Sequence, residues 1–160
     1  MSSAVATETT ESLSNTWVSA GIAGIAGTVV FGAVQMLMGA TGVIAVAIPA
    51  LYGVSGPSLA VGWAIHLFHG AVLGLGFALL ATRPSVEPYT RAVGSAAAVG
   101  LAYGLVLTIP TAGVAMPLWL SAVGFPNAPP LPNLSLMGFV GHGVYGLVLG
   151  ATYPVLRRLL

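Results

Sequence analysis

Residues 58–81, SLAVGWAIHLFHGAVLGLGFALLA, contain no charged side chain, and this stretch decides the fold of the chain. A helix of about 20 apolar residues crosses the hydrocarbon core of a bilayer, which is roughly 30 Å thick. Comparable stretches run from about Trp17 to Gly39, from about Ala92 to Leu118 and from about Leu134 to Leu156. The sequence therefore predicts an all-α integral membrane bundle of four transmembrane helices.

The composition of the 160-residue chain agrees with a surface solvated by lipid. Hydrophobic residues make up 57% and charged residues 4%, whereas roughly 25% of the residues of a soluble domain are charged. Four Arg and three Glu, without Lys or Asp, cannot cover a soluble surface, and four Arg build no nucleic-acid-binding patch. The expected partners are the lipid bilayer and other membrane subunits or a second copy of the chain. The absence of Cys removes disulfides and thiolate metal sites.

The segments outside the spans differ in polarity. Residues 1–15 are polar and predict a disordered tail ahead of a transmembrane domain over residues 16–160. Residues 40–57 are apolar but broken by Gly and Pro, which is typical of an interfacial or re-entrant segment. Residues 121–133 are rich in Pro and predict an extended surface loop.

The Arg positions predict the orientation. Arg83 and Arg91 lie between the second and third spans, and Arg157 and Arg158 follow the fourth span. With four spans, both segments lie on the same side as the N-terminus, and positively charged loops remain in the cytoplasm. We therefore expect a multi-pass protein of the cell membrane with cytoplasmic N- and C-termini.

The chain repeats a pattern at an offset of 76 residues, the spacing between His66 and His142. Residues 62–77 and 138–153 both read G-[W/F]-x-x-H-x-x-[H/Y]-G-x-x-L-G-x-x-[F/Y], and Gly24 corresponds more weakly to Gly100. Each unit holds two spans, so the copies point the same way through the membrane as parallel repeats. The predicted repeats cover about residues 17–82 and 92–158.

Small residues mark the helix faces expected to meet. Gly70 and Gly74 form one GxxxG stripe, and Gly146 and Gly150 form its counterpart. Such stripes let two membrane helices approach closely. We expect the second and fourth spans to pack through them as a pseudo-symmetric pair at the centre of the bundle.

Three His are the candidate functional residues, because polar groups inside a membrane are costly. His66 and His142 lie about eight residues into parallel spans, roughly 12 Å below the outer edge, so their imidazoles can meet. Two facing imidazoles can ligate haem b, and His66, His69 and His142 can together hold a transition metal. Proton relay or binding of a quinone headgroup, with Tyr145 as a polar partner, is a further alternative. Alternatively, each His only hydrogen-bonds a neighbouring helix.

Two other residues interrupt the apolar spans. Gln35 in the first span is expected to satisfy a polar group on a neighbouring helix. Pro110 is expected to kink the third span, with Thr108 or Thr111 donating to the carbonyl that loses its backbone partner.

The motifs around the two repeated His also carry a family resemblance. Gly62-Trp63-x-x-His66 together with Gly141-His142-x-x-Tyr145-Gly146 resembles a group of small four-helix membrane proteins of unknown activity, found chiefly in halophilic archaea. Members sometimes carry a generic histidine-kinase label, but this chain has no room for a soluble ATP-binding domain. The resemblance implies a cell-membrane protein and points to His66 and His142, and it transfers no activity.

Three functions follow as hypotheses. The short loops favour a structural or accessory subunit of a larger membrane complex. The His favour a haem- or metal-binding redox protein, and segment 40–57 favours a small channel or transporter. An independent enzyme is the least favoured, because no nucleophile–base pair, phosphate-binding loop or carboxylate pair occurs.

Overall fold

The structure is a computed structural model that describes the backbone of residues 2–160 and the side chains of residues 14–160. Every regular element in that part of the chain is helical. Four helical stretches are long and apolar enough to cross a membrane: Ser14–Leu37, Leu59–Ala81, Val93–Ala122 and Leu136–Leu159. The predictions of an all-α fold and of four helices long and apolar enough to span a membrane are confirmed.

The helices follow one another with short connections. The elements are α1 (Ser2–Leu37), α2 (Ile48–Leu51), α3 (Leu59–Ala81), α4 (Val93–Thr108), α5 (Met116–Ala122) and α6 (Leu136–Leu159). A π-helical turn (Val43–Ala47) precedes α2, and a 3-10 turn (Glu87–Thr90) precedes α4. The tail expected over residues 1–15 falls largely on residues 1–13, whose side chains lie outside the described part, so it stays a prediction.

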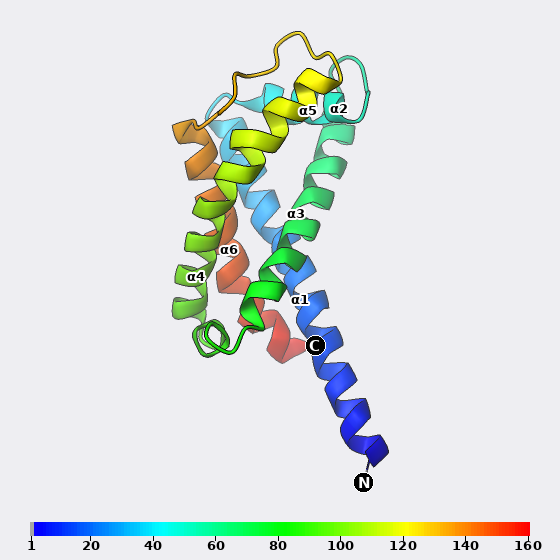
Figure 1. Ribbon diagram of the computed structural model, residues 1–160, viewed down its shortest axis with the longest axis vertical. Coiled ribbons are helices and arrows are strands. Elements are labelled where there is room, and N and C mark those ends of the chain that lie inside the picture. The colour runs from blue at the N-terminus through cyan, green and yellow to red at the C-terminus, as the bar shows by residue number, and fades with distance from the viewer. Residues whose placement is uncertain (1) are drawn as a thin grey trace.

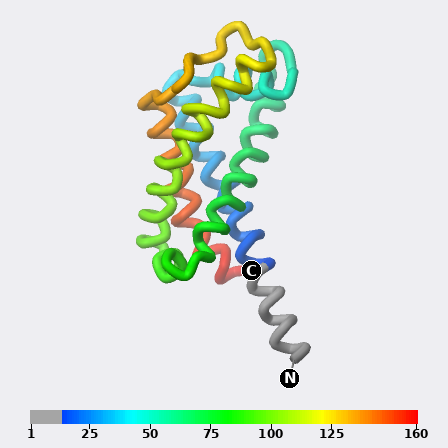
Figure 2. The backbone as a smooth tube through the Cα atoms, viewed as in Figure 1, coloured from blue at the N-terminus to red at the C-terminus, as the bar shows by residue number. Residues whose placement is uncertain are grey.

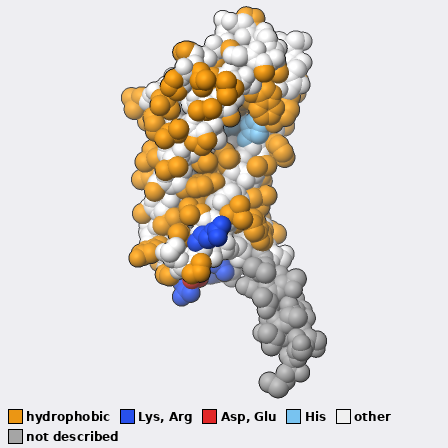
Figure 3. Space-filling view, viewed as in Figure 1, with side chains coloured by type: hydrophobic (Ala, Val, Ile, Leu, Met, Phe, Trp, Pro, Cys, Tyr) orange, Lys and Arg blue, Asp and Glu red, His pale blue; other side chains and the backbone are white. Residues whose placement is uncertain are grey.

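The bundle has two chemically different ends. The apolar segment 40–57 and α5 form one end, and the α3–α4 connection and the C-terminus form the other (Figure 1, Figure 2). Blue Arg side chains gather at the second end (Figure 3), where Arg158 donates to the Arg91 carbonyl at 2.8 Å and Arg91 pairs with Glu87 at 2.7 Å. Hydrogen bonding to Arg91 holds the pKa of Glu87 below its ordinary value. We call this the Arg-bearing end.

A serine begins each helix that carries a repeated His. The Ser58 hydroxyl accepts from the Val61 N–H at 3.4 Å, and the Ser135 hydroxyl accepts from the Gly138 N–H at 3.0 Å. An N-cap side chain satisfies a backbone donor that the first helical turn leaves free. The caps therefore fix where α3 and α6 begin, and with them the depths of the two His.

Pro110 changes the winding of the third span. Residues Ile109–Ala115 form a π-helical segment that joins α4 to α5 without interrupting the helical stretch. Thr108 donates to the Gly104 carbonyl at 3.3 Å, and Thr111 donates to the Leu107 carbonyl at 2.5 Å. The wider π turn accommodates the missing N–H of proline.

The glycine stripes face different helices from those expected. A Cβ on Gly74 would overlap the backbone of α1 at Ala20, and a Cβ on Gly150 would overlap the backbone of α4 at Ala96. Each stripe thus packs on the span that precedes it in the chain. The prediction that the stripes join the second and fourth spans is wrong, because bulky side chains separate α3 from α6.

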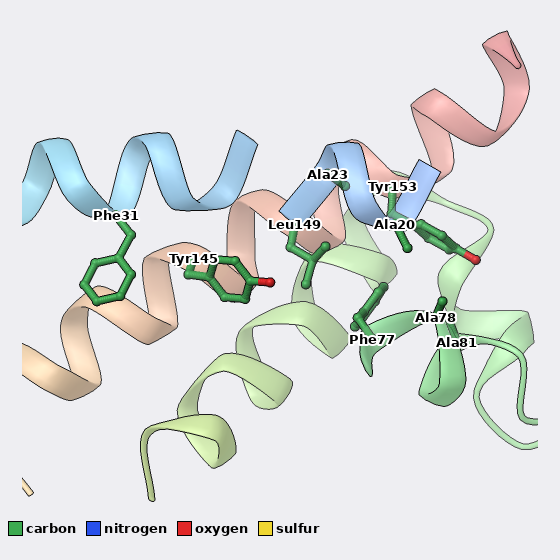
Figure 4. Packing of buried hydrophobic residues seen from close by; sticks show 9 residues of the cluster. All are labelled: Ala20, Ala23, Phe31, Phe77, Ala78, Ala81, Tyr145, Leu149 and Tyr153. Carbon is green, nitrogen blue, oxygen red and sulfur yellow. The ribbon is translucent and has the colours of Figure 1, made fainter. Parts of the chain in front are cut away.

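Aromatic side chains fill the space between α3 and α6. Tyr145 donates to the Gly70 carbonyl at 2.9 Å, and the Phe77 and Tyr153 rings meet edge to face with centroids 5.4 Å apart. Figure 4 shows these side chains projecting from different helices into one buried cluster. Tyr103 adds a bond from α4 to the Leu73 carbonyl at 2.7 Å. This core packs the half of the bundle nearer the Arg-bearing end.

Candidate functional site

A cavity of about 630 Å³ occupies the half of the bundle away from the Arg-bearing end. Small-molecule sites are typically about 300–1,000 Å³ and mostly apolar with a few polar groups. Imidazole atoms are visible at the surface of this half (Figure 3). The polar side chains in the lining include Gln35, Tyr52, His66, His69, Thr111 and His142.

His142 is satisfied on both ring nitrogens. Its Nδ1 lies 2.9 Å from the Gly138 carbonyl, and its Nε2 lies 3.0 Å from the Thr111 hydroxyl. A carbonyl can only accept, so Nδ1 carries the proton and Nε2 of the neutral ring is an acceptor. The single hydroxyl hydrogen of Thr111 lies within reach of both His142 Nε2 and the Leu107 carbonyl. Each ring nitrogen of His142 therefore has a neighbour inside the protein.

His66 and Gln35 are buried without complete hydrogen bonding. The side chains are 8% and 6% exposed, and neither His66 Nε2 nor Gln35 Oε1 has a hydrogen-bond partner. An unsatisfied buried polar atom costs about 1–3 kcal/mol. The expected role of Gln35, satisfying a neighbouring helix, does not hold for its side-chain oxygen.

Phe31 contacts both repeated His. Its ring centroid lies 5.3 Å from that of His66 and 5.0 Å from that of His142. Gly141 makes room for it, because a Cβ there would overlap the phenyl ring. The two imidazoles thus share one apolar neighbour, and the expectation that they meet each other stays a prediction.

His69 belongs to a separate contact at the rim of the cavity. The Tyr52 hydroxyl lies 2.7 Å from His69 Nε2, and the Tyr52 ring centroid lies 5.1 Å from that of Trp119. Tyr52 follows α2, so this contact ties segment 40–57 to α3 and α5. The segment expected to be interfacial or re-entrant closes one side of the cavity.

The arrangement does not suit the expected metal site. Among the described residues, no group of three His, Cys, Asp or Glu side chains could hold a metal ion. Axial ligation of haem uses one ring nitrogen of each His, and in this arrangement His142 Nε2 lies 3.0 Å from the Thr111 hydroxyl. Tyr145 was expected to be a polar partner of a cofactor. Its hydroxyl donates to the Gly70 carbonyl instead.

Sequence reasoning missed several residues of the site. Phe31 and Tyr52 carried no distinguishing signal, because aromatic residues are common in apolar segments. Thr111 and Gln35 did carry a sequence signal but were not assigned to the site. Thr111 follows Pro110, and Gln35 is an amide inside an apolar span.

The site as a whole is an apolar cavity with two unpaired polar atoms, one on α1 and one on α3. Its chemistry is that of a binding site for an uncharged molecule, since His is the only ionisable side chain besides Tyr in the lining. Comparison with protein-family models, curated proteins and solved structures finds no match for this chain.

Proposed function

We propose that this multi-pass membrane protein is an accessory subunit that holds a lipid-soluble small molecule in its cavity. The observation that carries the proposal is the cavity of about 630 Å³, which collects all three His and Gln35 in a mostly apolar lining. Such a site binds a ligand mainly by burying apolar surface and orients it with a few polar groups.

The other half of the bundle favours a binding site over a pore. A packed core lies next to the cavity, and its large side chains are at most 2% exposed: Phe77, Tyr145, Leu149 and Tyr153. A channel formed by one copy needs a polar path through both halves. Holding a ligand needs only one open half, and imidazole atoms are visible at the surface of the cavity half (Figure 3).

Two further parts of the proposal concern architecture. We propose that the bundle arose from two parallel repeats, with support from packing: Gly24 meets Gly70 and Gly74, and Gly100 meets Gly146 and Gly150, at the same offset of 76. We also propose that the protein belongs with the small four-helix proteins that it resembles. The Arg-bearing end is then cytoplasmic, and the cavity lies in the outer half of the cell membrane.

Ligand retention tests the proposed function. The protein and two variants are purified in the same mild detergent, extracted with organic solvent and analysed by mass spectrometry. Ala112→Phe fills the cavity, because Ala112 lies in its lining. Ala98→Phe is the matched control, since Ala98 is exposed on α4 and does not line the cavity.

We expect an organic compound at a fixed ratio in the wild type and in Ala98→Phe, and its loss in Ala112→Phe. Thermal unfolding of all three proteins checks that Ala112→Phe is folded. The proposal fails if the three extracts contain the same bulk lipids in the same amounts.

A further inference from the structure

Two unpaired polar atoms belong to one wall of the cavity. Phe31 and Gln35 are four residues apart on α1, which is about one helical turn, and the Phe31 ring touches His66 on α3. Gln35 and His66 both line the cavity, and each is more than nine-tenths buried. The remaining lining polar groups next to them, on His142 and Tyr145, are already hydrogen-bonded.

The unpaired atoms define what a partner must offer. Gln35 Oε1 is an acceptor and needs a donor, whereas a neutral His66 can accept or donate at Nε2 according to its tautomer. One hydroxyl group satisfies both atoms, because it donates one hydrogen and accepts another. A carbonyl or ether oxygen has no hydrogen to give and leaves Gln35 unpaired.

We infer that the bound molecule carries a neutral hydroxyl head, an alcohol or phenol, which bridges Gln35 Oε1 and His66 Nε2. This inference rests on the proposed function and adds the chemical class of the ligand. Both residues line the cavity, and each of the two atoms exposes less than 1 Å² of surface. The terminal torsions of Gln and His are soft and twofold, so binding needs only rotation about these torsions to present the two atoms to a ligand.

The rest of the ligand is apolar. The cavity lining around the polar wall includes Ile48, Leu51, Phe68, Leu73 and Met137. A charged head is disfavoured, because the lining holds no Arg, Lys, Asp or Glu to pair with it. A long-chain phenol therefore matches both parts of the site.

A pair of probes isolates the hydroxyl group. Para-nonylphenol and its methyl ether, para-nonylanisole, share ring and tail and differ in the donor hydrogen. The full chain is placed in lipid nanodiscs, each probe is titrated at equal mole fraction in the bilayer, and the thermal midpoint is followed by circular dichroism. A ligand that binds the native state raises this midpoint with concentration.

We expect the phenol to raise the midpoint of the wild type, and the ether to need about tenfold more for the same rise, because it leaves Gln35 unpaired. Gln35→Met keeps the length of the side chain and should make the phenol and the ether raise the midpoint at similar concentrations. Ala112→Phe should abolish the response to both, and Ala98→Phe should keep the wild-type pattern.

The outcomes separate the two proposals. Equal response to phenol and ether in the wild type, lost in Ala112→Phe, overturns the hydroxyl inference and leaves the cavity as a binding site. A wild type indifferent to both probes also overturns it. If the wild type responds to neither probe and no compound co-purifies with it, the proposed function is overturned together with the hydroxyl inference. The wild-type comparison needs no variant, so it stands if Gln35→Met fails to fold.

Discussion

At the scale of single residues, Thr111 makes His142 different from His66. Its hydroxyl lies 3.0 Å from His142 Nε2 and 2.5 Å from the Leu107 carbonyl. It therefore joins α6 to the π-helical segment between α4 and α5. Its counterpart at the offset of 76 is Gln35, which leaves the corresponding wall of the cavity unpaired.

Replacing Thr111 by Val should destabilise the protein by about 1 kcal/mol, the usual size of an interhelical hydrogen bond in a membrane protein. The shape is kept while the hydroxyl group next to His142 is lost. Thr152→Val is the matched control, because Thr152 bonds only to carbonyls of its own helix, at 2.8 and 3.3 Å. Unfolding in mixed detergent micelles measures both, and an equal loss in the two variants would contradict the role assigned to Thr111.

The sequence predicted part of this site and missed the rest for a physical reason. The depths of His66 and His142 follow from residue rise along two helices, which counting gives directly. Which side chain of α1 contacts the imidazoles depends on how α1 is rotated about its axis, and an apolar helix in lipid has no polar face to reveal this. Phe31 was therefore indistinguishable from its apolar neighbours.

At the scale of elements, glycine sets how closely the helices pack. Gly146 has the Gly100 carbonyl where its Cβ would be, and Gly104 has the His142 carbonyl. Backbone atoms cannot turn aside, so α4 and α6 must separate if either glycine gains a side chain. The GxxxG spacing predicted a close contact but not its partner, because the motif marks a face and leaves open which neighbour meets it.

Gly146→Ala should therefore destabilise the protein by about 2–3 kcal/mol, in the upper part of the range for overpacking. Gly143→Ala on the same helix is the control. Its Cβ would meet only the ends of two Leu side chains, at 3.3 and 3.4 Å, which can move aside. Both changes raise helix propensity equally, so the difference between their unfolding free energies reports the packing alone. Similar values for the two variants would refute close backbone packing at Gly146.

At the scale of the whole molecule, the two helix pairs pack in the same way, and the charged residues in the described part of the chain gather at one end of the bundle. The glycine contacts of α1 with α3 recur in α4 with α6, and the serine caps of α3 and α6 lie at the same end of the bundle. The charged residues in the described part of the chain lie at the other end. In the described part of the chain, the bundle thus carries its charge at one end, although the α1–α3 and α4–α6 helix pairs pack alike.

That polarity predicts which end faces the cytoplasm. All four Arg lie at the Arg-bearing end, and the connections at the cavity end, residues 38–58 and 123–135, have no charged residue. The natural chain has no Cys, so a single introduced thiol reports its own side of the membrane. Ser55 and Ser85 are both exposed and lie at opposite ends, which makes Ser55→Cys and Ser85→Cys a matched pair.

In intact cells, a membrane-impermeant maleimide should label Ser55→Cys at once and Ser85→Cys only after the membrane is permeabilised. The reason is that moving Arg-rich segments out of the cytoplasm is disfavoured, whereas the uncharged connections carry no such cost. The reverse labelling pattern would mean the opposite orientation in the membrane, with the cavity in the inner half of the bilayer. A hydroxyl-headed ligand would then have to reach Gln35 and His66 from the cytoplasmic leaflet, so this labelling also fixes the side from which the cavity is filled.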